Sequence, residues 1–214
     1  MLEVNNISKR YKRGSDEFIA LDNVSLKIGK GDFLTITGAS GAGKSTLLNA
    51  IGGLIYLDSG EVLFKGRDIY KQKSKKRDEY RKKNVGFMFQ QFHLIPYLTV
   101  IDNIKLTCYD KQQLDTVNNY LDEFSLTGLK YKYPSELSVG EKQRTAFIRA
   151  IISNPDILLA DEPTGNLDPG NSRILMSLVE EYHKYGGTVV VVSHDQLAAK
   201  YANRMITLEK GKTV

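Results

Sequence analysis

The stretch that most constrains this chain is a glycine-rich loop that ends in a lysine and a serine. It reads Gly38-Ala39-Ser40-Gly41-Ala42-Gly43-Lys44-Ser45-Thr46 and matches the pattern G-x-x-x-x-G-K-[ST]. An apolar, β-branched run at Phe33–Thr37 precedes the loop, and a helical pattern at Ser45–Leu54 follows it. A strand before the loop and a helix after it are the context that such a loop requires.

The residue types in this loop suit the binding of phosphate groups. Glycines let successive backbone N–H groups turn inward, and the following helix N-terminus adds the positive end of its dipole. Lys44 can reach β- and γ-phosphates, and the Ser45 hydroxyl can bind Mg²⁺. The structural alternative is a glycine-rich turn with a chance lysine. The residues predicted to contact a nucleotide here are Gly38, Ala39, Ser40, Gly41, Ala42, Gly43, Lys44, Ser45 and Thr46.

Two adjacent carboxylates end a second apolar strand pattern, Ile157-Leu158-Leu159-Ala160. Asp161 at the strand end suits Mg²⁺, directly or through water. Glu162 is then placed to orient or deprotonate an attacking water. The structural alternative is a pair of acids that cap a strand end, and the presence of the phosphate loop makes the catalytic interpretation the favoured one.

Two further polar residues follow predicted strands. Gln90 comes after Val85–Phe89 and is predicted to contact the metal or the water, while a bland surface glutamine is the alternative. His194 comes after Val189–Ser193, so its imidazole could bond a γ-phosphate. A lone histidine is often structural, and His93 and His183, which lack this context, receive no role.

A serine and a glycine precede a helical pattern later in the chain. Leu137-Ser138-Val139-Gly140-Glu141 leads into a helix through Lys142, Gln143 and Arg144. Ser138 and Gly140 could supply a hydroxyl and free N–H groups as a second anion site. Taken by itself, the pattern is better explained as an ordinary serine N-cap.

The rest of the chain predicts one α/β domain. Short apolar strands alternate with helices, which implies a buried, mainly parallel sheet, and helical periodicity replaces strand signals from Gln90 to about Asn154. The chain has 41% hydrophobic residues, a net charge of +5 and one cysteine, and its apolar runs are short of the ~20 residues of a membrane helix. With no pattern of a signal peptide, we expect a soluble, cytoplasmic chain. The basic stretch Lys71–Lys83 is interpreted as a solvated helix face.

Taken together, these motifs resemble the nucleotide-binding subunits of ABC transporters over nearly the whole chain. In family order, Gly38–Ser45 resembles Walker A, Gln90 the Q-loop, Leu137–Glu141 the signature, and Ile157–Glu162 Walker B with its catalytic glutamate. Asn166-Leu167-Asp168 resembles the D-loop, and His194 the switch histidine; Tyr11 stands where the family has an aromatic residue that stacks on adenine. The resemblance implies a P-loop core with an N-terminal antiparallel β subdomain, over about 1–89 and 156–214, and an inserted helical subdomain over about 90–155.

Within the family, Asp161–Asp168 and Gly86–Leu98 are similar to the lipoprotein-releasing and macrolide-exporting branch. The signature departs from the usual Leu-Ser-Gly-Gly-Gln, because Val139 replaces the first glycine and Glu141 the glutamine. A β-branched residue resists positive φ, so the loop must adopt a conformation open to valine at position 139.

The resemblance also implies cofactors, partners and a location. ATP and Mg²⁺ would bind between two head-to-tail subunits, each ATP lying between Walker A of one and the signature of the other. A separate membrane permease would be the partner, holding the chain at the inner face of the cell membrane, and no nucleic acid is expected. A regulatory ATPase that signals across the membrane without cargo, as in the cell-division branch, is the alternative. A GTPase is disfavoured, because no guanine-reading Asn-Lys-x-Asp stretch is present.

Overall fold

A mainly parallel sheet forms the centre of the molecule. The computed structural model describes residues 1–14, 16–194 and 196–214, and within these the larger sheet has the strand order β10-β9-β3-β8-β7-β6. Every neighbouring pair in it is parallel except β10 and β9. Its strands are β3 (Phe33–Thr37), β6 (Val85–Met88), β7 (Ile157–Asp161), β8 (Thr188–Val192), β9 (Arg204–Glu209) and β10 (Lys212–Thr213).

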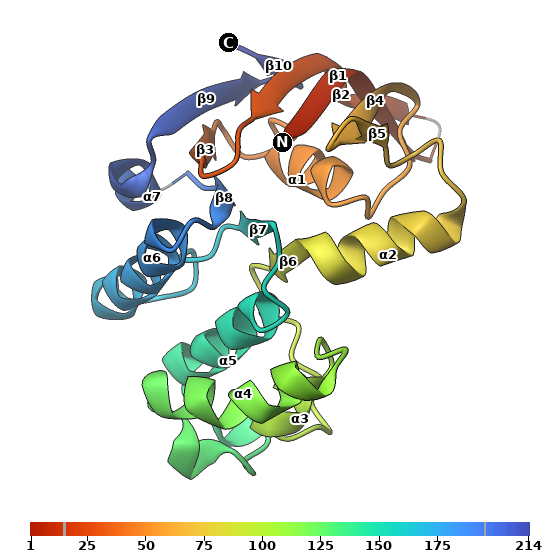
Figure 1. The fold of residues 1–214 in the computed structure, drawn as a ribbon. Coiled ribbons are helices and arrows are strands. Elements are labelled where there is room, and N and C mark those ends of the chain that lie inside the picture. The colour runs from red at the N-terminus through yellow and green to blue at the C-terminus, as the bar shows by residue number, and fades with distance from the viewer. Residues whose placement is uncertain (15, 195) are drawn as a thin grey trace.

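A smaller antiparallel sheet lies above the first helix in Figure 1. Its order is β2-β1-β4-β5, and its strands are β1 (Leu2–Arg13), β2 (Asp16–Ile28), β4 (Ser59–Phe64) and β5 (Arg67–Asp68). Near the end of the β1–β2 ladder where the chain passes from β1 into β2, Tyr11 pairs with Phe18. This pairing stacks two aromatic rings on each other.

The helices cover the central sheet on both faces. They are α1 (Lys44–Ile51), α2 (Ser74–Asn84), α3 (Val100–Lys105), α4 (Lys111–Glu123), α5 (Val139–Ile151), α6 (Pro169–Lys184) and α7 (Gln196–Tyr201), with 3₁₀ turns at Thr127–Leu129 and Pro134–Glu136. The side chains of β8 point alternately to the two faces. Val190 and Val192 pack in the core that contains α1 and the antiparallel sheet, whereas Val189 and Val191 pack in the core of α3, α5 and α6.

A helical lobe formed by α3, α4 and the first part of α5 projects from the central sheet (Figure 1). In the chain it lies between β6 and β7, where helical periodicity replaces strand signals. The predicted fold class, a mainly parallel core with an antiparallel sheet and inserted helices, is confirmed. The subdomain boundaries near residues 90 and 155 stay a prediction.

Several elements differ from what the sequence alone predicts. Strands β9 and β10 were not expected, because Arg204–Glu209 mixes polar residues into a partly exposed strand. The β1–β2 hairpin is also longer than its apolar positions indicate. Most of the basic stretch at 71–83 forms a helix, α2, which begins at Ser74; its lysines are exposed, whereas Arg77 and Tyr80 are buried. The described residues contain no helix that is both long and apolar enough to span a membrane.

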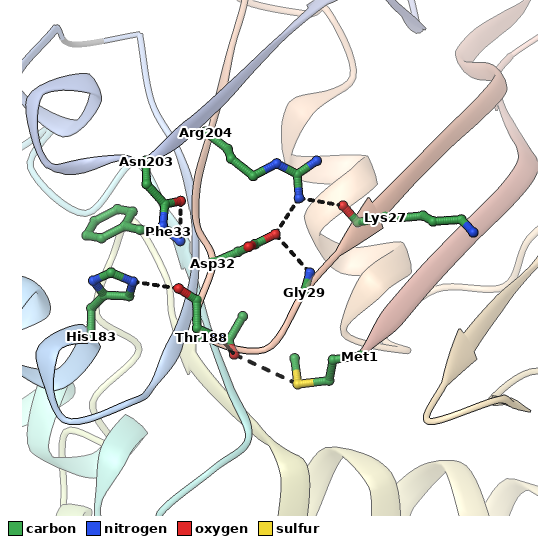
Figure 2. Close-up of polar contacts among 10 residues, drawn as sticks. Met1, Lys27, Gly29, Asp32, Phe33, His183, Thr188, Asn203 and Arg204 are labelled. Atoms are coloured by element: carbon green, nitrogen blue, oxygen red, sulfur yellow. Dashed lines mark hydrogen bonds and ion pairs between the residues drawn. The ribbon is translucent and has the colours of Figure 1, made fainter.

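Polar contacts fix the edge of the central sheet from which its parallel strands start (Figure 2). The Asp32 carboxylate accepts a hydrogen bond from the Gly29 N–H at 2.8 Å and pairs with the Arg204 guanidinium. His183 bonds the Gly31 carbonyl through Nε2 at 2.8 Å. The contact with Gly31 gives His183 a structural role. The predicted catalytic and binding residues follow the opposite ends of the strands.

Candidate nucleotide-binding site

Three neighbouring strands bring the predicted chemistry together at one edge of the sheet. Strands β3, β8 and β7 are adjacent and parallel, so their carboxyl ends meet. The glycine-rich loop follows β3, Glu162 follows β7, and His194 follows β8 by two residues. This edge is where ligands bind in open α/β sheets.

Two glycines of the phosphate loop are required both by their backbone angles and by close contacts with neighbouring strands. Gly38 and Gly43 have φ values of 143° and 99°, and a Cβ on them would lie 2.2 Å from the Leu208 carbonyl oxygen and 2.1 Å from that of Ala20. No side chain fits at such distances. The loop is therefore wedged between β2 and β9, which fixes where its N–H groups lie.

Lys44 is folded back beneath this loop. Its ammonium donates to the Gly38 carbonyl at 2.8 Å and to the Ala39 carbonyl at 3.1 Å, and the residue is only 7% exposed. A cation held at this place can meet the phosphates that the loop N–H groups bind.

Ser45 and Asp161 form the second polar pair. The Ser45 hydroxyl donates to Asp161 Oδ1 at 2.9 Å. Burial raises the pKa of Asp161 and the Glu162 charge adds to this, while the Ser45 hydrogen bond and Lys44 act in the opposite direction. A cation beside Asp161 would offset this burial of negative charge.

These oxygens fit Mg²⁺ in one particular way. Within residues 1–14, 16–194 and 196–214, no group of three or more His, Cys, Asp or Glu side chains could hold a metal by itself. Mg²⁺ is commonly held by one or two carboxylates, with substrate phosphates and water as the remaining ligands. The donor set of Ser45 and Asp161 agrees with a metal that arrives with a nucleotide.

Glu162 and His194 form the third pair. His194 Nδ1 lies 2.9 Å from Glu162 Oε2, and the His194 backbone N–H donates to the same oxygen at 3.3 Å. Glu162 has a φ of 45°, which is uncommon for a non-glycine residue, and its own N–H donates to the Val192 carbonyl. The strand-end backbone thus turns this carboxylate toward His194.

One cavity of about 510 Å³ gathers most of the predicted residues. It is lined by Ser40, Gly41, Gly43, Lys44, Ser45, Thr46, Gln90, Glu162 and His194, together with Phe18 and Ala20 of β2. Gly38, Ala39 and Ala42 instead line a neighbouring hollow beside β9, with Ser40 and Gly41 lining both. Asp161 does not line the cavity itself but accepts a hydrogen bond from Ser45, which does.

Tyr11 does not line this cavity, whereas Phe18 does. The two rings stack with centroids 5.5 Å apart and planes at 28°. Sequence reasoning chose Tyr11 and missed Phe18. The signal that could have found Phe18 is the antiparallel pairing of an aromatic residue opposite Tyr11.

Gln90 connects the cavity to the segment that follows β7. Its side chain lines the cavity, and its backbone carbonyl accepts a hydrogen bond from Asn166 Nδ2 at 3.1 Å. The predicted contact of the Gln90 side chain with a metal stays a prediction.

Ser138 and Gly140 lie apart from the cavity, at the start of α5. Ser138 is the N-cap, its hydroxyl accepting from the Glu141 N–H at 3.4 Å, while the Glu141 carboxylate accepts from the Ser138 N–H at 2.7 Å. That backbone hydrogen bond lowers the pKa of Glu141. Val139 is the first residue of the helix and has no positive φ, so the expected valine-compatible conformation is confirmed.

Comparison with known proteins supports this geometry. The family described as "ABC transporter" matches residues 21–165. A macrolide export ATP-binding/permease protein MacB of Chlorobaculum tepidum is 39% identical over the whole chain, which spans about a third (34%) of that relative. The uncharacterized ABC transporter ATP-binding proteins MJ1508 of Methanocaldococcus jannaschii and YvrO of Bacillus subtilis are each 41% identical, with 98% and 96% of their lengths covered.

Solved structures agree with these relatives. The ATP-binding cassette MJ0796, solved as a dimer in a post-hydrolysis state bound to ADP and Pi, is 36% identical with a TM-score of 0.91, over all of this chain and 96% of that one. The relatives are transport proteins by name, which favours transport over the regulatory alternative. On the strength of its motifs, its fold and these matches, the chain belongs to the ABC transporter family, as an ATP-binding cassette that hydrolyses ATP.

Proposed function

We propose that this cassette binds Mg²⁺–ATP in the 510 Å³ cavity and hydrolyses it as a head-to-tail dimer, so as to power a separate membrane permease. The observation that carries the proposal is the meeting of three pairs at one sheet edge. These are Lys44 with the loop carbonyls, Ser45 with Asp161, and Glu162 with His194.

Each pair supplies one part of the chemistry. Lys44 and the loop N–H groups hold the β- and γ-phosphates and stabilise the charge that develops on them. Mg²⁺, held through Ser45 and Asp161, would neutralise phosphate charge. Glu162 accepts a proton from the attacking water or orients that water, and His194 holds the Glu162 carboxylate in place.

The position of the signature supports a dimer. Ser138 is exposed and caps α5 at a distance from the cavity of its own subunit, so it can serve the nucleotide of a partner subunit. MJ0796, at 36% identity, was solved as a dimer.

A groove beside Gln90 is the surface that we assign to the permease. It has a volume of about 460 Å³ and is lined by residues that include Phe87, Phe89, His93, Leu106 and Tyr109. A short helix of a permease loop that turns apolar side chains toward these residues fits the groove, whose lining also includes Asp78, Arg81 and Lys82. The MacB relatives are named as ATP-binding and permease proteins in one chain, and this chain matches only about a third of each.

The chain just after Gln90, which forms one wall of this groove through His93, is hydrogen-bonded to α5. The Arg149 guanidinium donates to the carbonyls of Phe92 and His93, and burial lowers the pKa of Arg149. A push on this wall is therefore transmitted to the helix that begins at the signature. Through the permease, the cassette would work at the inner face of the cell membrane.

The test is Glu162→Gln, which keeps the side-chain shape and removes its charge. We expect ATP binding to be spared and hydrolysis to slow by about 10²–10⁴-fold, because general-base help is lost. With ATP no longer consumed, the dimer should persist, since a ligand bound across two subunits stabilises their association. Gel filtration with light scattering should show monomers without nucleotide and dimers with ATP.

Adding Ser138→Arg to this variant should abolish the dimer and leave ATP binding by the monomer intact. Lys75→Arg, an exposed change on α2, is the matched control and should leave the dimer unchanged. A double mutant that still dimerises with ATP would show the head-to-tail arrangement to be wrong for this chain.

A further inference from the structure

The amide of Asn171, in the first turn of α6, lies between the D-loop and the signature. Its Nδ2 donates to Asp168 Oδ2 at 2.5 Å, and its backbone N–H donates to Asp168 Oδ1 at 3.0 Å. On its other side, Asn171 Oδ1 faces Gly140 of α5. One side chain therefore touches two segments that are about thirty residues apart in the chain.

Gly140 is required here by space and not by its backbone angles. It lies in the helix α5 and has no positive φ, so an alanine would suit the local conformation. A Cβ on Gly140, however, would lie 2.5 Å from Asn171 Oδ1 and 3.1 Å from Asn171 Cγ. Such contacts are shorter than atoms tolerate, so a larger residue at position 140 would force either the Asn171 side chain or α5 to shift.

Asp168 fixes the orientation of the Asn171 amide. As the N-cap of α6, Asp168 also accepts from the Gly170 N–H at 2.8 Å, and these hydrogen bonds lower the pKa of its carboxyl group. With Nδ2 bonded to Asp168, Oδ1 points toward Gly140. The amide therefore acts as a spacer of defined length and direction.

The same segment is tied to two other parts of the site. Asn166 Nδ2 donates to the Gln90 carbonyl at 3.1 Å, and Gln143 of α5 donates to the Pro163 carbonyl. Residues 163–168 thus contact the Q-loop, and through Asn171 and Gln143 they contact α5. These contacts are a physical route by which a displacement of the D-loop would reach the signature.

We propose that Asn171 is a positioning residue that holds the signature loop (Leu137–Glu141) and the D-loop segment (163–168) as one unit. The inference rests on the proposed function, in which the signature faces the nucleotide of the partner subunit. ATP-dependent dimerisation then requires the signature to be held in the correct place, and the contact through Asn171 holds it against the D-loop segment. A looser joint lowers the fraction of subunits that are competent to pair and weakens the dimer in proportion.

The experiment uses the Glu162→Gln chain and measures the dimer dissociation constant at saturating Mg²⁺–ATP by sedimentation equilibrium. Asn171→Ala removes the spacer without adding atoms, and we expect it to weaken the dimer several-fold while monomer affinity for ATP is unchanged. Gly140→Ala adds the colliding methyl group and should weaken the dimer by at least about tenfold. In the double variant Gly140→Ala/Asn171→Ala the methyl group has room, so the dimer should recover to within about threefold of Asn171→Ala alone.

Gly128→Ala is the matched control, because a Cβ on Gly128 meets nothing within 4 Å, and it should leave the dimer unchanged. If the double variant dimerises no better than Gly140→Ala, the methyl group clashes with something other than Asn171 and the inference is overturned. An Asn171→Ala dimer as tight as its parent would also overturn it. If the Glu162→Gln parent itself fails to dimerise with ATP, the proposed head-to-tail function is wrong, and this inference, which depends on it, is rejected as well.

Discussion

His194 Nδ1 lies 2.9 Å from Glu162 Oε2, although the two residues end different strands. The contact exists because β7 and β8 are parallel neighbours and because Glu162 takes a left-handed backbone conformation at the end of its strand. The histidine is 69% exposed at its side chain and the glutamate 13%. The exposed ring therefore contacts the mostly buried carboxylate from the solvent side.

This relationship predicts the effect of removing the imidazole. In His194→Ala, Glu162 loses a hydrogen-bond partner and samples other rotamers, so we expect kcat to fall by at least about tenfold. Monomer affinity for ATP should change little, because Lys44 and the loop N–H groups are untouched. His194→Asn, which can still donate to Glu162, should recover part of the rate. Steady-state ATPase kinetics check this, and equal loss in both variants would show that Glu162 does not depend on the donor.

Asp161→Asn tests the assignment of the metal. An amide keeps the size of the side chain and a partner for Ser45, but it is a poorer ligand for a hard cation. The Mg²⁺ concentration for half-maximal ATPase activity should therefore rise by about tenfold or more, the effect of losing an interaction of ~1.5–3 kcal/mol with a charged group. Asp115→Asn, an exposed change on α4, is the control. An unchanged Mg²⁺ requirement in Asp161→Asn would remove Asp161 from the metal site.

The stacked pair of Tyr11 and Phe18 predicts how the base is held. If the rings form a platform for adenine, Tyr11→Ala and Phe18→Ala should each weaken ATP binding several-fold, since aromatic contacts contribute about 0.5–1.5 kcal/mol. Tyr11→Phe should bind normally, and GTP should be tolerated in part, because stacking does not read base edges. Tyr185→Ala, at a ring that is 85% exposed, is the control for isothermal titration. Equal loss in Tyr11→Phe and Tyr11→Ala would point to the hydroxyl instead.

Val139→Gly tests the departure in the signature. Val139 starts α5, is 46% exposed, and needs no positive φ, so a glycine is not required there. We expect ATPase activity to be similar or modestly higher. The thermal midpoint should fall slightly, because glycine in a helix destabilises by up to about 1 kcal/mol. A strong loss of ATPase activity would mean that this chain uses the valine in a way that the family pattern does not describe.

Much of the candidate site could be predicted from the sequence because its parts are local. Nine consecutive residues build the phosphate loop, so Lys44 and Ser45 are placed by the strand before the loop and by the helix that begins at Lys44. Asp161, Glu162 and His194 each follow an apolar strand pattern, and parallel strands bring their ends to one edge. The periodicity of these short segments also predicted the class of the fold.

The contacts that only the tertiary structure decided join segments far apart in the chain. Phe18 enters the cavity because the β1–β2 ladder sets it opposite Tyr11 and because β2 lies against the phosphate loop. Gly140 meets Asn171 because α5 and α6 pack on the same face of the central sheet. Local propensity and spacing carry no information on such distances, since they depend on how whole elements pack. The sequence by itself therefore determined which residues can do chemistry, and the packing of elements decided which neighbours hold them in place.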